Sequence, residues 1–203
     1  MIKNEINKGE EVLQNLKNYF ENIKQFPTYS YHEIDYDYDV ILELNDLTEF
    51  CALSSSKNGD CLYNSLSTIF FGKEEYYYLF KLGSFLVLIK NEKYFRDYFK
   101  KIHYEQVFEK FIENMSLKGK WANQFNLISL SFFLNKRIFI YSIDTETNIP
   151  YNTNYDMCRN KSNPIMIGHK NNHFVPFVSE NDEAKFNEIE TEPFSEFRRN
   201  FKF

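Results

Sequence analysis

The chain has 203 residues, enough for one well-buried domain with an additional segment at one end. Hydrophobic residues make up 43% of it and aromatic residues 19%, which excludes an intrinsically disordered chain. The formal net charge is −5, whereas proteins that bind nucleic acids usually display a basic surface. We therefore expect no nucleic-acid partner.

The sequence also argues against a membrane or secreted protein. No apolar run approaches the ~20 residues that span a bilayer, and the first 14 residues are too charged for the apolar part of a signal peptide. We expect no membrane partner and an intracellular, cytoplasmic location, which would be the host cytoplasm for a protein of a virus or another pathogen.

The three cysteines are odd in number and widely spaced, at Cys51, Cys61 and Cys158. This spacing matches neither a disulfide framework nor a zinc motif. Reduced thiols are the simplest interpretation, and we expect neither a metal nor another cofactor.

Two elements are predicted before residue 45. An amphipathic helix over residues 2–24, ending before Pro27, is predicted by the near-helical spacing of Ile6, Leu13, Leu16, Phe20 and Ile23. Residues 29–44 alternate aromatic residues with aspartates, which favours a partly exposed strand or an ordered loop.

The stretch NGDCLYNSLSTIFFG, residues 58–72, changes from a polar, glycine-containing loop to a helical pattern. The apolar side chains that form one stripe at i, i+4, i+7 and i+8 are Leu62, Leu66, Ile69 and Phe70. The pattern predicts a helix that begins at Cys61 and ends at Gly72.

Three further helices are predicted over residues 74–91, 93–115 and 122–135, of which the first is apolar enough to cross the core. Short β-like runs follow at 137–143, 164–168 and 173–178. The last two are close enough for a hairpin, and residues 144–163 form a longer excursion. The tail from 179 to 203 is expected to be a docking helix or partly disordered.

Cys61 is a candidate nucleophile because of its position. A thiol at a helix N-terminus faces unsatisfied backbone N–H groups and the positive end of the helix dipole, and both favour the thiolate. Gly59 would let the loop amides approach a bound carbonyl and stabilise an oxyanion. The local pattern alone favours the alternative that Cys61 is a small buried apolar residue.

A nucleophilic cysteine needs a histidine as its base, and the chain has four. His32 and His103 are interpreted as surface or packing residues. His169 and His173 lie on either side of the short connection between the last two strands. His173 begins a strand, which is a rigid mount for a general base, so we favour His173.

Three segments in this order resemble the OTU (ovarian tumour) family of cysteine proteases, chiefly deubiquitinases. They are NGDCLYNSLS around Cys61, KWANQFNLISLSFFLNKRIFIYS with Trp121 and Ala122, and NNHFVPFV with His173 and Phe174. The family pattern is Asp-Gly-x-Cys-Leu-aromatic, then Trp-Gly or Trp-Ala before a helix and strand, then His-aromatic on a late strand. The resemblance covers about residues 50–178.

The resemblance implies that Cys61 attacks the carbonyl that follows the C-terminal glycine of ubiquitin, while His173 takes its proton and later protonates the leaving lysine amine. Backbone amides around Gly59, Asp60 and Cys61 would hold the oxyanion. Trp121 would pack beneath the site and support the histidine strand, or simply pack in the core.

Two positions depart from the family pattern. Asn58 stands where the family has the Asp of Asp-Gly-x-Cys, and Val175 stands two residues after the histidine, where many members have Asp or Asn. Val175 cannot orient an imidazole. Asn58, Asn172 or an acid from the N-terminal segment would have to do so.

The resemblance implies an α+β, papain-type fold with a small mixed or antiparallel sheet flanked by helices. We divide the chain into an N-terminal segment (1–45), which either extends the domain or contacts a partner, an OTU-like catalytic domain (46–180) and a tail (181–203). The expected partner is ubiquitin or polyubiquitin. The alternatives are a non-catalytic ubiquitin-binding module and a thiol protease acting on a viral polyprotein or another ubiquitin-like modifier.

Overall fold

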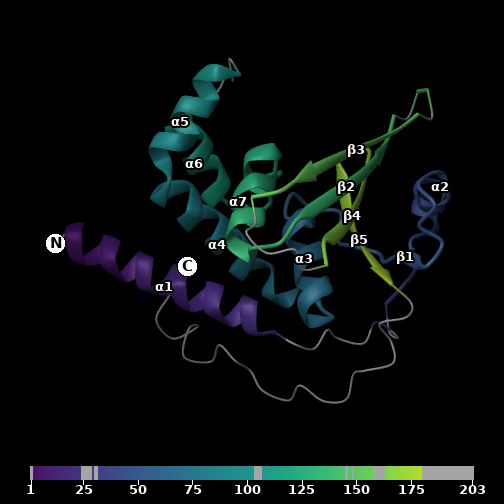
Figure 1. Cartoon of the computed structure of the whole chain (residues 1–203), viewed down its shortest axis with the longest axis horizontal. Helices are drawn as coiled ribbons and strands as arrows, with labels where there is room; N and C mark the ends of the chain where they lie inside the picture. The colour runs from purple at the N-terminus through teal and green to yellow at the C-terminus, as the bar shows by residue number, and fades with distance from the viewer. Residues whose placement is uncertain are drawn as a thin grey trace.

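The computed structural model describes residues 2–23, 29, 32–102, 107–144, 146–147, 149–157 and 163–179. The elements in chain order are α1 (Ile2–Asn22), η1 (Tyr36–Tyr38), α2 (Asp39–Leu44), β1 (Phe50–Ala52), α3 (Cys61–Phe71), η2 (Glu74–Tyr76), α4 (Tyr77–Lys90), α5 (Glu92–Lys101), α6 (Phe108–Ser116), α7 (Gln124–Leu134), β2 (Ile138–Ile143), β3 (Pro150–Tyr155), β4 (Ile165–Lys170) and β5 (His173–Ser179). The helices pack around one mixed sheet (Figure 1), so the predicted α+β class is confirmed.

The sheet has five strands in the order β1-β5-β4-β2-β3. Strands β2 and β4 are parallel, and every other neighbouring pair is antiparallel. Strands β2, β4 and β5 were predicted, whereas β1 and β3 were not. Strand β1 is only three residues long, and β3 is a mostly exposed edge strand with few apolar residues, so neither gives a clear sequence signal.

The predicted hairpin is confirmed as the connection between β4 and β5. Its turn consists of Asn171 and Asn172, with φ angles of 52° and 60°. Positive φ at both central residues is the feature of a type I′ turn, which asparagine tolerates better than most residues. The turn pairs Lys170 with His173 and His169 with Phe174.

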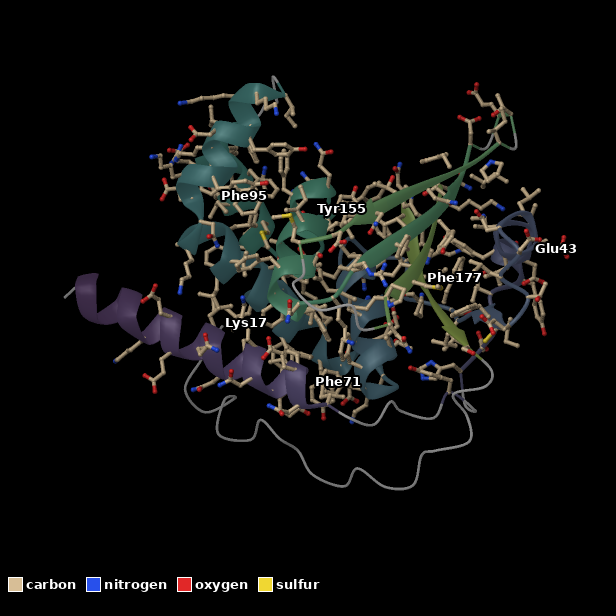
Figure 2. The ribbon with its side chains drawn as sticks, viewed as in Figure 1. Lys17, Glu43, Phe71, Phe95, Tyr155 and Phe177 are labelled. Atoms are coloured by element: carbon tan, nitrogen blue, oxygen red, sulfur yellow. The ribbon has the colours of Figure 1, made fainter. Side chains whose placement is uncertain are left out.

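The two faces of the sheet are covered by different elements. On one face, Phe174 and Val178 pack into the large core that contains α3. On the other, Val175 and Phe177 pack against buried residues of η1 and α2. Alternate residues of a strand point to opposite faces, so β5 contributes to both cores. Phe177 is labelled in Figure 2, on the side of the sheet where α2 lies.

The described residues of segment 29–44 do not form a strand, and the alternative of an ordered loop describes residues 32–35 but not the helical residues 36–44. Ile34 forms a single bridge with Leu53, and η1 and α2 follow. The Asp35 side chain accepts a hydrogen bond from the Asp37 amide and so begins η1. Tyr38, Ile41 and Leu42 are spaced as on a helix and are buried, which is the signal that the aromatic–aspartate alternation concealed.

Most predicted helices are confirmed. Helix α3 begins at Cys61 and ends at Gly72, which has a left-handed backbone. The segment predicted as one helix over 93–115 contains two: α5 ends at Lys101, and α6 begins at Phe108 after Val107, whose backbone is extended. Residues 103–106, including His103, lie outside the described part. Cys158 and residues 180–203 of the predicted tail lie outside it as well.

No helix among the described residues is both long and apolar enough to cross a membrane.

Helix α1 contacts α4 and α7, as Figure 1 shows. Its residues Leu13, Leu16 and Phe20 are buried in the same core as α3. The Phe20 ring lies 5.0 to 5.3 Å, between centroids, from the rings of Phe70, Phe80 and Phe133. We propose from these contacts that α1 folds as part of the catalytic domain and is not a separate unit.

Replacing Phe20 by alanine should lower the free energy of unfolding by about 3–5 kcal/mol, because it removes a buried aromatic ring and leaves a cavity. Urea denaturation monitored by circular dichroism measures this loss. The matched control is Asn15→Ala, at an exposed position of the same helix, which should change stability by less than about 0.5 kcal/mol. Equal stability of the two variants would contradict the integration of α1.

Candidate active site

The Cys61 sulfur lies between the start of α3 and the start of β5. Cys61 is 5% exposed and is the first residue of the helix. The backbone N–H groups of Phe174, Leu62 and Cys61 itself lower the pKa of the thiol, Phe174 most strongly. The Phe174 contact places the sulfur beside the backbone of the residue that follows His173.

Burial controls the ionisation of this thiol. It raises the pKa of Cys61, and the charge of Asp60 raises it further, while the three N–H groups act in the opposite direction. The net direction is upward. The backbone N–H groups favour the thiolate, as expected from the sequence, but desolvation of the thiol, which the sequence did not reveal, outweighs them.

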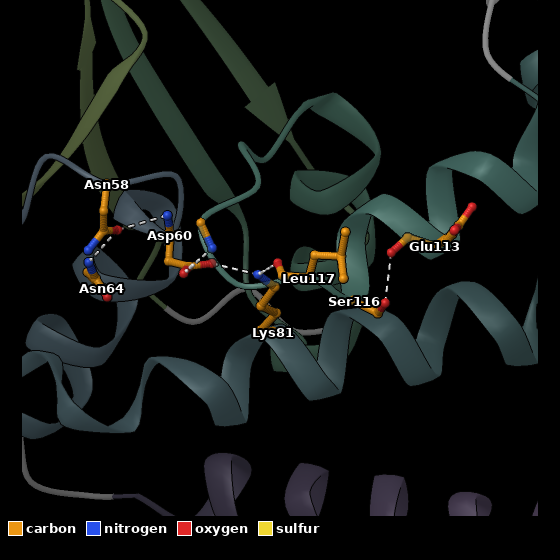
Figure 3. A network of polar contacts seen from close by, with 8 residues as sticks. Asn58, Asp60, Asn64, Lys81, Glu113, Ser116 and Leu117 are labelled. Atoms are coloured by element: carbon orange, nitrogen blue, oxygen red, sulfur yellow. Dashed lines mark hydrogen bonds and ion pairs between the residues drawn. The ribbon is translucent and has the colours of Figure 1, made fainter. Parts of the chain in front are cut away.

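Asn58 holds the turn that precedes Cys61 (Figure 3). Its Oδ1 accepts hydrogen bonds from the Asp60 amide at 2.9 Å and from Asn64 Nδ2 at 3.2 Å, and its backbone oxygen accepts from the Cys61 amide at 3.2 Å. Asn58 thus performs the loop-stabilising part of the role of an aspartate without supplying charge. The Asp60 amide has an acceptor within the loop and does not point freely at a substrate.

Gly59 packs against the loop that joins α6 to α7. A Cβ atom at residue 59 would lie 1.9 Å from the carbonyl oxygen of Gly119 and 2.8 Å from Cδ1 of Trp121. Glycine is therefore needed here for contact within the protein, a requirement that the sequence alone did not reveal. Trp121 is 64% exposed, so the expectation that it packs beneath the site or in the core was wrong.

His173 is buried at the start of β5. Its Nε2 is inaccessible to solvent and has no hydrogen-bond partner among the described residues, and its backbone oxygen accepts a hydrogen bond from the Tyr38 hydroxyl at 3.0 Å. Burial, followed by the charge of Lys57, lowers the pKa of His173, while Asp35, the Ser55 backbone and Glu74 act in the opposite direction. The resulting neutral imidazole is the form that can accept a proton.

The residues considered for orienting His173 lie in different environments. Val175 is fully buried in the core on the α2 side. The side-chain oxygen of Asn58 is bonded within its own loop, and Asn172 belongs to the β4–β5 turn and lines the cavity described next. Among these alternatives, the acid of the N-terminal segment that acts electrostatically on His173 is Asp35.

A cavity of about 310 Å³ opens beside Cys61, on the face of the sheet that carries α3 and α7. Residues from four parts of the chain line it, among them Cys61, Trp121, Asn123, Tyr151, His169 and Phe174. The nucleophile thus borders a space that can receive a narrow segment of a substrate.

His169 is a site residue that the sequence analysis passed over in favour of His173. Its ring lies 4.5 Å from that of Phe174, and its Nδ1 is 3.4 Å from Ser142 Oγ. Burial, followed by the proximity of His173, lowers its pKa. The hairpin register contained the signal, because residues 169 and 174 are paired and paired residues lie on the same face.

Of the two remaining histidines, the structure describes His32. His32 is hydrogen-bonded to the carbonyl of Gly72 at the far end of α3, and His103 lies outside the described residues. Within the described part of the chain, no group of three or more His, Cys, Asp or Glu residues could hold a metal ion.

The candidate site thus combines a thiol at the start of α3, a histidine at the start of the adjoining strand β5 and an open cavity beside the thiol. The sequence model of the family described as OTU-like cysteine protease matches residues 56–174, more than half of the chain. The chain belongs to this family. No curated protein sequence gives a significant match.

Solved structures support the same fold. The OTU domain of OTUD1 has a TM-score of 0.58 and 16% identity, with 70% of this chain and 93% of that one covered. The viral OTU domain protease of Dera Ghazi Khan virus has a TM-score of 0.54 and 19% identity, with coverages of 67% and 83%. The Hazara virus OTU, solved bound to ubiquitin, has a TM-score of 0.51 and 17% identity, with coverages of 64% and 81%.

Replacing Gly59 by alanine should destabilise the protein by about 1–3 kcal/mol, because the added methyl group overlaps the Gly119 carbonyl. The matched control is Gly9→Ala, since its new Cβ would lie 3.6 Å from Leu86 Cδ2, an ordinary contact, within helix α1. That variant should gain up to about 1 kcal/mol. Urea denaturation measures both, and a neutral Gly59→Ala would refute the close approach.

Cys61 should react slowly at neutral pH. In a Cys51→Ser/Cys158→Ser background, its rate of alkylation by iodoacetamide should rise with pH through an inflection above the ordinary thiol value of ~8.5, because burial disfavours the thiolate. The same chain unfolded in urea provides the control. An inflection in the folded protein at or below that of the unfolded chain would contradict the predicted direction.

Proposed function

We propose that the protein is a thiol-dependent deubiquitinase, which hydrolyses peptide and isopeptide bonds at the C-terminus of ubiquitin through Cys61 and His173. The observation that carries the proposal is the position of the Cys61 sulfur, beside the backbone that follows His173 and at the edge of an open cavity. Membership of the OTU-like family supports protease chemistry, and the ubiquitin-bound Hazara virus relative supports ubiquitin as the partner.

In the proposed mechanism, the resting pair is a neutral thiol and a neutral imidazole, because burial disfavours the charged form of each. His173 takes the thiol proton as the sulfur attacks the carbonyl, and then gives that proton to the leaving lysine amine. Water, deprotonated by His173, then hydrolyses the thioester, which releases ubiquitin and restores the thiol.

The oxyanion of each tetrahedral intermediate needs hydrogen-bond donors. We assign this role to the backbone amide of Gly59, in the turn before α3. Such a donor is typically worth ~3–4 kcal/mol in comparable hydrolases. Asp60 and Cys61 are left out because their amides donate to the side-chain and backbone oxygens of Asn58.

We propose that the cavity receives the C-terminal tail of ubiquitin. The tail ends in glycine, and a residue without a side chain can pass between Trp121 and the strand face that carries His169. Tyr151 from the edge strand lines the opposite side. His169 would then contact the substrate as a binding residue, while His173 acts as the base.

The test uses the full chain and a ubiquitin probe that carries a C-terminal electrophile, together with a fluorogenic ubiquitin substrate. Cys61→Ala should abolish labelling, and His173→Ala should lower kcat by about 10²–10⁴-fold because the general base is lost. His169→Ala should mainly raise KM. A kcat loss that follows His169→Ala instead would move the base to residue 169, and equal labelling of wild type and Cys61→Ala would remove the enzyme proposal.

One observation favours a second candidate, a non-catalytic ubiquitin-binding module. No carboxylate follows His173, since Val175 is buried in an apolar core, and Asn58 is engaged in its own loop. Ubiquitin binding without cleavage of any chain would support this candidate. Probes built on other ubiquitin-like modifiers, run in parallel, would show whether the chain prefers a different modifier.

A further inference from the structure

An ion pair lies directly behind the nucleophile. Lys81 Nζ is 2.6 Å from Asp60 Oδ1, and the side chains of Lys81 and Asp60 are 12% and 2% exposed. The other carboxylate oxygen, Oδ2, accepts a hydrogen bond from the Gly119 amide at 2.8 Å, and Lys81 Nζ also donates to the Leu117 carbonyl at 2.6 Å (Figure 3). Both charges are therefore hydrogen-bonded to backbone as well as to each other.

This network joins three segments that are distant in sequence. Asp60 is the residue before Cys61, Lys81 belongs to α4, and Leu117 and Gly119 belong to the loop between α6 and α7. The same loop carries Trp121, which touches Gly59 and lines the cavity. The wall of the cavity and the nucleophile turn are thus both attached to one carboxylate.

A structural contribution alone does not account well for this arrangement. Removing two charges from water is costly, and a buried ion pair often stabilises a protein no more than well-packed apolar residues would. The pair lies next to the reacting sulfur, and the charge of Asp60 acts on the Cys61 thiol in the direction that disfavours the thiolate. The ammonium of Lys81 opposes that charge.

Other ionisable groups face the thiol and set the background against which the pair acts. The charge of Cys61 acts on the Tyr38 hydroxyl of η1, and the other ionisable groups that line the shared cavity are Tyr151, Tyr155 and His169. His173 begins the strand whose next residue, Phe174, acts on the sulfur through its backbone. Each of these stays in place when Asp60 or Lys81 is replaced. A change that follows the replacement is therefore attributable to the pair.

We propose that Asp60 and Lys81 are positioning residues for the reaction: they fasten the Trp121 loop to the nucleophile turn, and Lys81 neutralises the carboxylate that lies beside the Cys61 sulfur. The inference rests on the proposed function for its catalytic consequence. The attachment of the Trp121 loop and the effect of the ion pair on the thiol can both be tested without a substrate.

The experiment compares Lys81→Met, Asp60→Asn and the double variant in the full chain with Cys61 as the only cysteine. Asparagine removes the charge and keeps one side-chain oxygen, which can still accept from the Gly119 amide, while its NH2 group replaces the oxygen that accepted from Lys81. Methionine removes the charge and the donor to Leu117. The control is Lys90→Met, on the same helix, which removes an exposed ion pair with Glu10. Trp121 is the one tryptophan in the chain and reports directly on its loop.

The first measurement is the pH dependence of Cys61 alkylation, a signature that a purely structural contact would not move. Lys81→Met should shift the inflection upward by about one pH unit, since the carboxylate charge is no longer opposed. Asp60→Asn should shift it downward by a similar amount. The double variant should return toward wild type, and Lys90→Met should not differ from it.

The second measurement is acrylamide quenching of Trp121 fluorescence. Lys81→Met and the double variant should show stronger quenching than wild type, because the tie to Leu117 is lost. Asp60→Asn should respond less, because its remaining oxygen can still accept from the Gly119 amide and Lys81 can still donate to the Leu117 carbonyl. Ubiquitin turnover should fall about 10- to 100-fold in Lys81→Met, mainly in kcat, if the loop and the turn lose their alignment.

Unchanged alkylation profiles in both single variants, or quenching that does not respond to Lys81→Met, would overturn the proposal. Asp60→Asn decides the electrostatic part if Lys81→Met fails to fold, because it keeps an acceptor for the Gly119 amide and leaves the hydrogen bond from Lys81 to Leu117 in place. If the alkylation profiles shift as expected but the wild-type protein does not cleave ubiquitin, the role of the Asp60–Lys81 pair is supported and the proposed function is rejected. If the wild-type protein cleaves ubiquitin but the alkylation profiles of the variants do not change, the proposed function is supported and the role of the ion pair is rejected.

Discussion

The contact between α3 and β5 is the interaction on which the candidate site depends. Ser65, one turn into the helix, donates a hydrogen bond from Oγ to the Phe174 carbonyl at 3.1 Å, while the Phe174 amide acts on the Cys61 thiol. Both polar groups of one strand residue are thereby used by one helix. This fixes the height of the helix along the strand, and with it the separation between the sulfur and the residue before Phe174.

The same contact explains the ionisation of the site. A sulfur held against a strand inside the core loses solvent, and the few amides that face it do not compensate fully for that loss. The imidazole of His173 is also desolvated, so both partners are uncharged at rest. Charge then develops mainly during attack, when fixed backbone donors are most effective.

The sequence was informative wherever local physics decides the structure. The helix that starts at Cys61, its end at Gly72 and the hairpin before His173 follow from apolar spacing and turn residues. Strand β3 was missed because an exposed edge strand has no buried face to produce alternation. The segment after residue 33 was misread because its aspartates begin short helices.

The parts of the site that depend on tertiary contacts could not be predicted in this way. The exposure of Trp121, the contact of Gly59 with Gly119 and the pairing of Asp60 with Lys81 each join segments that are far apart in sequence. Desolvation of Cys61 is of the same kind, since it depends on how closely β5 packs on α3. His169 could have been identified from the sequence, because the predicted β4–β5 turn pairs it with Phe174 and so places both residues on the same face of the sheet.

The pairing of β1 with β5 determines when the sheet can be completed during translation. Residues 50–52 find their partners only at residues 177–179, and β5 also supplies the backbone against which the sulfur rests. During synthesis from the N-terminus, the thiol-bearing helix therefore emerges from the ribosome long before the strand that covers it. Until then the nascent chain carries an uncovered cysteine and an incomplete sheet, and the candidate site is complete only once β5 has been made.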